Sequence, residues 1–498
     1  MANPVIDWRE RAAKTVVDGR SFIDGDLHDA VGGERFDCIS PIDGRVLGRV
    51  VRGQAADIDL AVKAARAAFE DGRWARRSPA QRKRTLQVFA DRILAAKEEL
   101  ALLETLDMGK PIQYSLSVDV PSTARTIAWY AEAVDKIYDE IAPTGHNALA
   151  LIQREAMGVI GVIVPWNYPM IMAAWKLGPA LAAGNSVVLK PSEKSPLTAL
   201  KLAELALAAG LPPGVFNVVP GYGHEAGEAL ALHPDVDAIG FTGSTRVGRK
   251  MLEYAGRSNL KRVYNELGGK SAFLVFPDFD DLDRCAKTLA GSIFFNQGES
   301  CNAPSRLMVH ESIADDFAKR VAAEAPKYRP ADPLDPKTVM GALVDDGQLR
   351  TVMSYIDAGQ TEGARLLAGG AQARAETGGY YVEPTVFDGV RNDMRIAREE
   401  IFGPVLSIIR FKDEAEAVRL ANDSAYGLQA SVWSSNVDRA HRVARALRAG
   451  TVHVNQYDDD DITVPFGGYK QSGNGRDKSL HAFDKYTELK TTWLRINS

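Results

Sequence analysis

Short apolar runs alternate with helix-like patterns through the middle of the chain. Residues 158–164 (GVIGVIV) form an unbroken apolar run of strand length, which is typical of a strand buried on both faces. A helical pattern follows from Pro169 to Gly184, and Ser186–Lys190 (SVVLK) is the next predicted strand. Further strands are predicted at 215–219, 237–241 and 262–267, with helices at 225–232 and 245–254. Elements that alternate at this spacing predict βαβ units and a parallel, doubly wound sheet.

The helix that follows SVVLK has clear start and stop signals. Ser195 is a candidate N-cap, Pro196 suits the first helical position and Gly210 suits the position after the end. We therefore expect this helix to begin at Pro196.

The pattern begins again after Gly268 with different spacing. A strand at 272–276 and a helix at 281–295 precede a loop that carries Cys301, which indicates a second α/β domain. The first 130 residues are rich in alanine, and helices are predicted there at 57–72 and 79–108.

Composition narrows the class of protein. With 498 residues, 45% of them apolar and 25% charged, the chain reads as a soluble globular protein of about three domains. A net charge of -5 offers no basic surface for nucleic acid. The uncharged stretch 157–175 contains Pro165 and Pro169, which would break a membrane-spanning helix. Three widely spaced cysteines and the absence of a leader pattern favour a reducing, cytoplasmic location.

Two segments are candidates for binding a nucleotide. Gly243–Gly248 (GSTRVG) lies between a strand and a helix, where backbone N–H groups and the helix dipole bind phosphate; a βα turn that simply needs glycine is an equal alternative. Lys190 and Glu193 follow a parallel strand, where an acid can accept hydrogen bonds from ribose hydroxyls and repel the 2′-phosphate of NADP. An exposed Lys/Glu pair is the alternative there.

Three residues could carry chemistry. Cys301 lies in a loop with a nearby glycine, Glu266 ends a strand just before Gly268 and Gly269, and Asn167 follows a buried strand, where its amide can donate to an oxyanion. Taken alone, each has a plain structural alternative: an inert buried thiol, a loop salt bridge and a turn residue. Cys38 and Cys285 are expected to be packing residues. The sequence signals no metal site.

Seven motifs together make the chain resemble the aldehyde dehydrogenases. They are VPWNYP, LKPSE, FTGSTRVG, ELGGKS, NQGESC, EEIFGPV and PFGGYKQSGNGR, which occur in the family's order from about residue 20 to the C-terminus. The resemblance implies an α/β fold with a Rossmann-like NAD-binding domain (1–137 and 156–267), an α/β catalytic domain (268–477) and a small β oligomerisation element (138–155 and 478–498). A dimer or tetramer is expected, with 138–155 and 487–494 paired as a sheet across subunits.

The resemblance also implies roles for single residues. Cys301 would be the nucleophile, Glu266 the general base and Asn167 an oxyanion donor. The residues expected to bind NAD are Val164, Trp166, Lys190, Glu193, Gly223, Gly227, Gly243, Ser244, Leu267, Glu400 and Phe402. The Cys301 thiolate would attack the aldehyde, hydride would pass to NAD, and Glu266 would activate the water that hydrolyses the thioester.

The tail from Thr451 to Trp493 is especially similar to γ-glutamyl-γ-aminobutyraldehyde dehydrogenases of putrescine breakdown, although Asn265 and Asn302 depart from the family pattern. Residues expected to line the substrate entrance are Tyr168, Trp175, Asp458, Asp459, Asp460 and Phe466. Carboxylates at this mouth would attract ω-amino or γ-glutamylamino aldehydes, and steering should favour the simple amine over the glutamyl compound. A broad-specificity aliphatic aldehyde dehydrogenase is the alternative.

Overall fold

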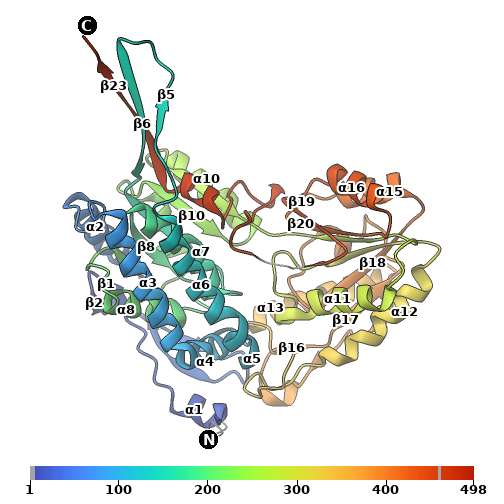
Figure 1. Cartoon of the computed structure of the whole chain (residues 1–498). Coiled ribbons are helices and arrows are strands. Elements are labelled where there is room, and N and C mark those ends of the chain that lie inside the picture. Colours follow the sequence, from blue (N-terminus) through green and yellow to red (C-terminus); the bar gives the residue numbers. More distant parts are fainter. Residues whose placement is uncertain (1–5, 458–460, 498) are drawn as a thin grey trace, which may run out of the picture.

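Two lobes and a projecting arm make up the molecule in the computed structural model, which describes residues 6–457 and 461–497. One lobe holds the N-terminal half of the chain, and the other holds most of the C-terminal half (Figure 1). Each lobe is built on its own seven-stranded sheet.

The sheet of the first lobe is mostly parallel and is covered by helices on both faces. Its order is β11 (Arg262–Glu266), β10 (Ala238–Thr242), β7 (Val159–Ile163), β8 (Ser186–Lys190), β9 (Phe216–Val218), β1 (Ser21–Ile23) and β2 (Asp26–His28), the last two antiparallel. One face packs on α7 (Pro169–Ala183) and α8 (Leu197–Ala208). Helices α3 (Pro79–Ala95), α4 (Lys97–Met108) and α6 (Val120–Ala133) pack against these two and share the same hydrophobic core. The other packs on α2 (Ala55–Glu70), α9 (Glu228–Leu232) and α10 (Thr245–Arg257). The predicted doubly wound α/β class is confirmed.

The second lobe repeats this three-layer plan. Its sheet order is β14 (Arg365–Ala368), β17 (Thr385–Asp388), β18 (Val405–Phe411), β13 (Arg306–His310), β12 (Ala272–Val275), β20 (Gln429–Trp433) and β21 (Thr451–Val454), with only β14 antiparallel. Helices α11 (Leu282–Phe294) and α12 (Ala314–Glu324) cover one face. The other face packs on α13 (Asp346–Thr361), α15 (Glu414–Asn422) and α16 (Val437–Ala446).

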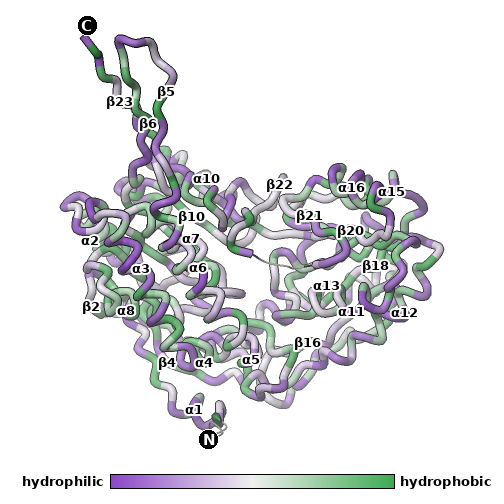
Figure 2. Tube along the Cα trace, in the orientation of Figure 1, coloured by the Kyte–Doolittle hydropathy of each residue, from purple (hydrophilic) through white to green (hydrophobic). Residues whose placement is uncertain are grey.

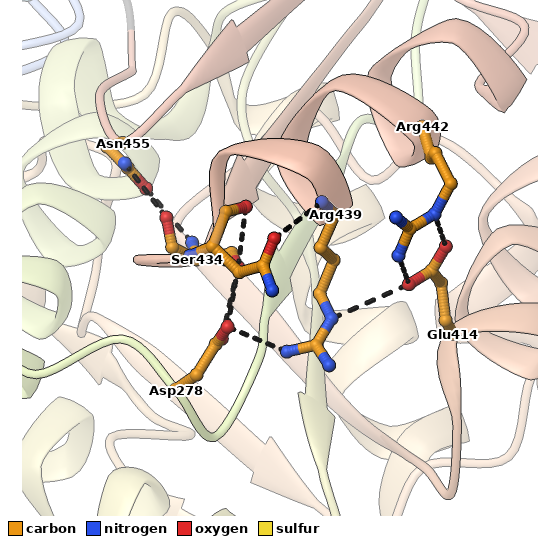
Figure 3. A network of polar contacts seen from close by, with 7 residues as sticks. Asp278, Glu414, Ser434, Arg439, Arg442 and Asn455 are labelled. Carbon is orange, nitrogen blue, oxygen red and sulfur yellow. Dashed lines mark hydrogen bonds and ion pairs between the residues drawn. The ribbon is translucent and has the colours of Figure 1, made fainter.

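A polar network fixes the ends of two strands in this lobe (Figure 3). Ser434, just after β20, donates to Asp278 (2.9 Å), and its backbone N–H donates to the Asn455 side chain just after β21 (3.0 Å). Arg439 of α16 pairs with Asp278 (2.7 Å) and lies 3.5 Å from Glu414 of α15. The network therefore ties β20 and β21 to the helices that cover them.

The arm is a three-stranded sheet of β5 (Glu140–Ala142), β6 (Ala148–Ala156) and β23 (Thr487–Arg495). β23 runs antiparallel to β6 of the same chain over its whole length, from the pair Thr487–Ala156 to the pair Arg495–Ala148. The expectation that these two segments pair across subunits is therefore wrong for that contact, because they already satisfy each other. Hydrophobic stretches nevertheless run along the projecting arm (Figure 2).

The start and the N-cap predicted for α8 were wrong, because a residue distant in the sequence caps this helix. Helix α8 begins at Leu197 rather than at Pro196, and Ser195 does not cap it, because the Ser195 hydroxyl donates to the Trp166 carbonyl (3.3 Å). The Asp107 carboxylate accepts from the Leu197 N–H instead (2.8 Å). The helix predicted at 79–108 is two helices that meet at Ala96.

Candidate active site

A cavity of about 780 Å³ lies between the two lobes and brings most of the predicted site residues together. Its walls come from the loop after β7, the turn after β10, the loop that carries Cys301 and the segment before β23. The predicted residues that line it are Trp166, Asn167, Tyr168, Trp175, Gly243, Ser244, Leu267, Cys301, Glu400, Phe402 and Phe466.

A strained and well-anchored loop holds Cys301. Asn296, Gln297 and Gly298 have φ values of 48°, 57° and 71°, a left-handed run that is costly for the two residues with a Cβ. The Gln297 side chain accepts from the Gly341 N–H (3.0 Å), and Glu299 accepts from the Val344 N–H (3.1 Å). These contacts hold the loop against the rest of the second lobe and fix where the half-buried thiol lies.

Asn167 is locked beside this loop. Its Nδ2 donates to the Glu299 carbonyl (2.8 Å), and its own carbonyl accepts from Asn296 Nδ2 (3.0 Å). A carboxamide has two N–H donors, so one remains for a ligand within the part of the chain that the structure describes. The side chain is buried and lines the cavity, which suits an oxyanion donor.

Gly268 and Gly269 allow two close approaches. A Cβ at Gly268 would lie 2.1 Å from a carboxylate oxygen of Glu400, and one at Gly269 would lie 2.3 Å from the Cys301 carbonyl oxygen. The Gly269 N–H donates to Glu400 (2.9 Å), and burial raises the pKa of Glu400 to about 7. The glycine pair therefore lets the Glu400 and Cys301 segments meet at the floor of the cavity.

Glu266 ends β11 but does not line the cavity among the described residues. Its Oε1 lies against Gly467 and Gly475, at 2.7 Å and 2.9 Å from where their Cβ atoms would be. Both carboxylate oxygens are buried without a hydrogen bond in the described structure. Burial, and next the negative charge of Asp477, raise the pKa of Glu266 well above its usual value.

A buried ion cluster behind Glu266 was missed by sequence reasoning. Asp477 accepts from Lys176 (2.8 Å) and from Lys485, and all three side chains are almost completely buried. Although burial alone would raise the pKa of Asp477, the two lysines hold it below its usual value. Lys176 is the single charged residue of α7, a signal that could have marked the cluster.

A second group of predicted residues gathers at the carboxyl ends of β7 and β8. Lys190 Nζ lies 3.3 Å from Glu193, and the Val164 N–H donates to the Lys190 carbonyl (3.3 Å). A Cβ on Gly227 would lie 3.9 Å from Cδ of Lys190, and a Cβ on Gly223 would have no described atom within 4 Å. Ser244 caps α10 and, with Gly243, lines the cavity. This glycine-lined edge, with an acid beside a helix N-terminus, fits a dinucleotide.

Aromatic rings form one wall of the substrate side. Trp175 and Phe466 lie 5.0 Å apart, and the Tyr168 hydroxyl lies 2.7 Å from the Ser300 hydroxyl. Two of the rings expected at the substrate entrance face lysines of the chain. Lys110 Nζ lies 4.1 Å from the Tyr168 ring centroid, and Lys478 Nζ lies 5.4 Å from the Trp175 ring centroid. On the cofactor side, Trp166 contacts Phe402 edge-on at 5.2 Å.

Asp458, Asp459 and Asp460 lie outside the described residues. Asp461, the last residue of that acidic run, accepts from the backbone N–H and the hydroxyl of Thr463, so it caps a turn. No cluster of potential metal ligands occurs within residues 6–457 and 461–497. Over the same residues, every helix is too short or too polar to cross a membrane.

Comparisons with known proteins agree over nearly the whole chain. Residues 28–492 match the model of the aldehyde dehydrogenase family. The chain is 53% identical to the Escherichia coli NADP/NAD-dependent aldehyde dehydrogenase PuuC, over 99% of this chain and 98% of that protein.

Two solved structures match closely. A Pseudomonas syringae indole-3-acetaldehyde dehydrogenase, in complex with NAD⁺ and IAA, superposes with a TM-score of 0.98 at 59% identity and covers 98% of this chain and 99% of its own. A Burkholderia cenocepacia γ-glutamyl-γ-aminobutyraldehyde dehydrogenase gives 0.97 at 58% identity, with 99% of each chain covered. The resemblance expected from the seven motifs is confirmed, and the chain belongs to the aldehyde dehydrogenase family.

Proposed function

We propose that the protein oxidises an amino-substituted aldehyde to its carboxylic acid, with Cys301 as nucleophile and NAD as hydride acceptor. The observation that carries the proposal is one cavity that is lined by Cys301, at the end of an anchored loop, together with Asn167, Glu400 and Ser244. This arrangement supports a reacting carbon between a thiol on one side and a dinucleotide site on the other.

The first half of the reaction needs a thiolate and an oxyanion donor. The Cys301 sulfur attacks the aldehyde carbon, and the oxygen becomes an anion that accepts from the free Asn167 N–H and the Cys301 backbone N–H. Each such donor contributes about 3–4 kcal/mol to the lowering of the barrier. The residues assigned to NAD would hold it so that it could accept the hydride from this carbon, which would leave the acyl group as a thioester on Cys301.

Glu266 performs the second half. A carboxylate that removes a proton from water generates the hydroxide that hydrolyses the thioester. Its raised pKa makes the ionised carboxylate a stronger base toward that water. From its position against Gly467 and Gly475, the side chain must turn toward Cys301, and the small glycines leave room for that rotation.

NAD binding is assigned to the first lobe for the adenosine and pyrophosphate, and to residues of the second lobe for the nicotinamide end. Lys190 and Glu193 would hold the adenosine ribose, Gly243 and Ser244 the pyrophosphate, and Glu400 with Phe402 the nicotinamide ribose. Trp166, Val164, Leu267, Gly223 and Gly227 complete this surface. The proposed division assigns 1–137 with 156–267 to NAD binding, 268–477 to catalysis and 138–155 with 478–498 to assembly. The presence of two separate sheets and an arm supports it.

The proposed substrate class is inferred from the substrate of a solved relative and from the negative charge of one segment of the chain. One solved relative is described as acting on γ-glutamyl-γ-aminobutyraldehyde, and the acidic run that begins at Asp458 adds negative charge to this region of the sequence. An ω-amino or γ-glutamylamino aldehyde from polyamine breakdown fits both. A broad-specificity aliphatic enzyme is the second candidate, favoured by the aromatic wall of Trp175 and Phe466. A cytoplasmic location stays a prediction of composition.

A dimer or tetramer is proposed from the arm. Ile141, Leu489 and Trp493 are 69%, 60% and 66% exposed on a sheet whose outer edges are unpaired within the described chain. Exposed apolar strands of this kind are covered by a second copy in stable proteins.

The test is NADH absorbance on mixing the protein with NAD and a panel of aldehydes. The panel contains propanal, 4-aminobutanal, its γ-glutamyl adduct and succinic semialdehyde. NADH should form with all but the last at useful rates, and most efficiently with the amino-substituted compounds. A lack of NADH with every aldehyde would overturn the proposed reaction, and highest efficiency with propanal would favour the broad-specificity candidate.

A further inference from the structure

Part of the cavity lining is a chain of hydrogen-bonded side chains. Asn302, directly after the nucleophile, donates from Nδ2 to Gln429 Oε1 (3.1 Å). Gln429 Nε2 in turn lies 2.8 Å from His453 Nε2. Asn302, Gln429 and His453 all line the cavity, from the nucleophile loop, β20 and β21 respectively. We call these three residues the polar strip.

The hydrogen bonds of the polar strip run in one direction, from donor to acceptor. Because Gln429 Oε1 accepts from Asn302, its Nε2 faces His453, and the His453 Nε2 must be the acceptor of that bond. The two neighbours hold the Gln429 carboxamide at both ends, and the Ser434–Asn455 contacts fix the strands that carry it.

Gln429 retains bonding capacity toward the cavity. A carboxamide has two N–H donors and an oxygen that accepts twice, and the strip uses one of each. One donor and one acceptor remain on a side chain that is 5% exposed and buried against the cavity, within the described residues. Leaving both unmatched beside a bound substrate costs free energy, so a ligand that supplies both partners is favoured.

We propose that Gln429 is a specificity-determining residue that reads a secondary amide on the substrate. An amide presents one N–H and one C=O side by side, which matches the remaining acceptor and donor of Gln429, whereas an ammonium group only donates. The substrate class is thus an aldehyde with an amide several bonds from the carbonyl, with its methylenes against Trp175 and Phe466. The inference rests on the proposed function and refines its substrate toward the γ-glutamylamino compounds.

Neutral probes separate this recognition from charge steering. In 4-acetamidobutanal the amide N–H occupies the place of one CH₂ group of 6-oxoheptanal, so the two differ in a single donor. The native enzyme should show a higher kcat/KM for the amide, by about five- to tenfold for one hydrogen bond. This ratio should not change with salt, because neither probe is charged. A ratio of one or less in the native enzyme would overturn the proposal.

The variant Gln429→Met keeps length and removes the amide. It should lower the amide-to-ketone ratio by about tenfold or more and change kcat/KM for propanal, which has no amide, much less. Ser292→Ala is the matched control: Ser292 also lines the cavity, but its hydroxyl already donates to the Thr288 carbonyl (2.9 Å), so the ratio should stay native. Equal losses for both probes in Gln429→Met would show a purely structural role. Failure of the native enzyme to form NADH with any of the aldehydes, including both probes, would instead reject the proposed function itself.

Discussion

The carbonyl oxygen of Cys301 lies 2.3 Å from the position that a Cβ on Gly269 would take. No real Cβ tolerates such a distance from a backbone atom, so the position of the nucleophile depends on Gly269 having no side chain. In the same way, the position of the Glu400 carboxylate depends on Gly268, the preceding residue, having no side chain.

Gly269→Ala should therefore displace the Cys301 loop. We expect the free energy of unfolding to fall by about 1–3 kcal/mol and kcat/KM for propanal to fall about 100-fold, since small misplacements of a nucleophile are costly. Thermal unfolding and NADH formation measure the two effects. Gly256→Ala, at an exposed site of α10 with open space around it, should leave activity native and stabilise slightly. Native activity in Gly269→Ala would refute this dependence.

The pH dependence should report Glu266. Burial and Asp477 raise its pKa, and only the ionised form can take a proton from water, so kcat should fall with falling pH at values above the ordinary carboxyl range. Asp477→Asn removes a negative charge that raises the pKa of Glu266, while Lys176 and Lys485 remain. The acid limb of the kcat–pH profile, where kcat falls with falling pH, should therefore move to lower pH. A limb that stays in place, or moves to higher pH, would contradict the assignment.

Cofactor choice should depend on Glu193. Its carboxylate lies at the ribose end of β8 beside Lys190, so it repels a 2′-phosphate at close range. The kcat/KM ratio of NAD to NADP should exceed one in the native enzyme and decrease in Glu193→Ser. The account of this position fails if NADP is preferred by the native enzyme.

The arm should mediate assembly. Sedimentation at micromolar protein should give a dimer or tetramer, and Trp493→Asp should shift it toward monomer by placing a charge on the exposed apolar strand. Val437→Asp, which places the same charge on an exposed apolar residue of α16 outside the arm, is the control and should assemble normally. A native monomer at this concentration would rule out the proposed oligomer.

The sequence predicted those parts of the fold that depend on local pattern. The buried strand at Ser186–Lys190 and the helix from Thr245 are examples, because burial on both faces and a turn with glycine leave a clear signal. The cap of α8 was not predictable in this way, since Asp107 provides it from ninety residues earlier. The same limit explains why 138–155 and 487–494 were expected to pair between subunits and not within one chain.

In the candidate site, too, the sequence predicted some features, and others depend on tertiary contacts. Motif resemblance named Cys301, Asn167 and Glu400, which meet at one cavity, but it did not show that Glu266 lies turned toward Gly467 and Gly475. Gln429 and His453 carry no local signal at all, since a polar residue in a strand is ordinary until its neighbours are known. Tertiary contacts alone reveal them.

The most direct test of the central claim is the mass of Glu266→Gln after reaction with propanal and NAD. Without its base, the variant should release one NADH per active site in a burst and then stall as the thioester. Peptide mass mapping should place a single propionyl group on Cys301 and none on Cys38 or Cys285, which are buried outside the cavity. A burst without an acyl group on Cys301, or an acyl group on another residue, would contradict the account.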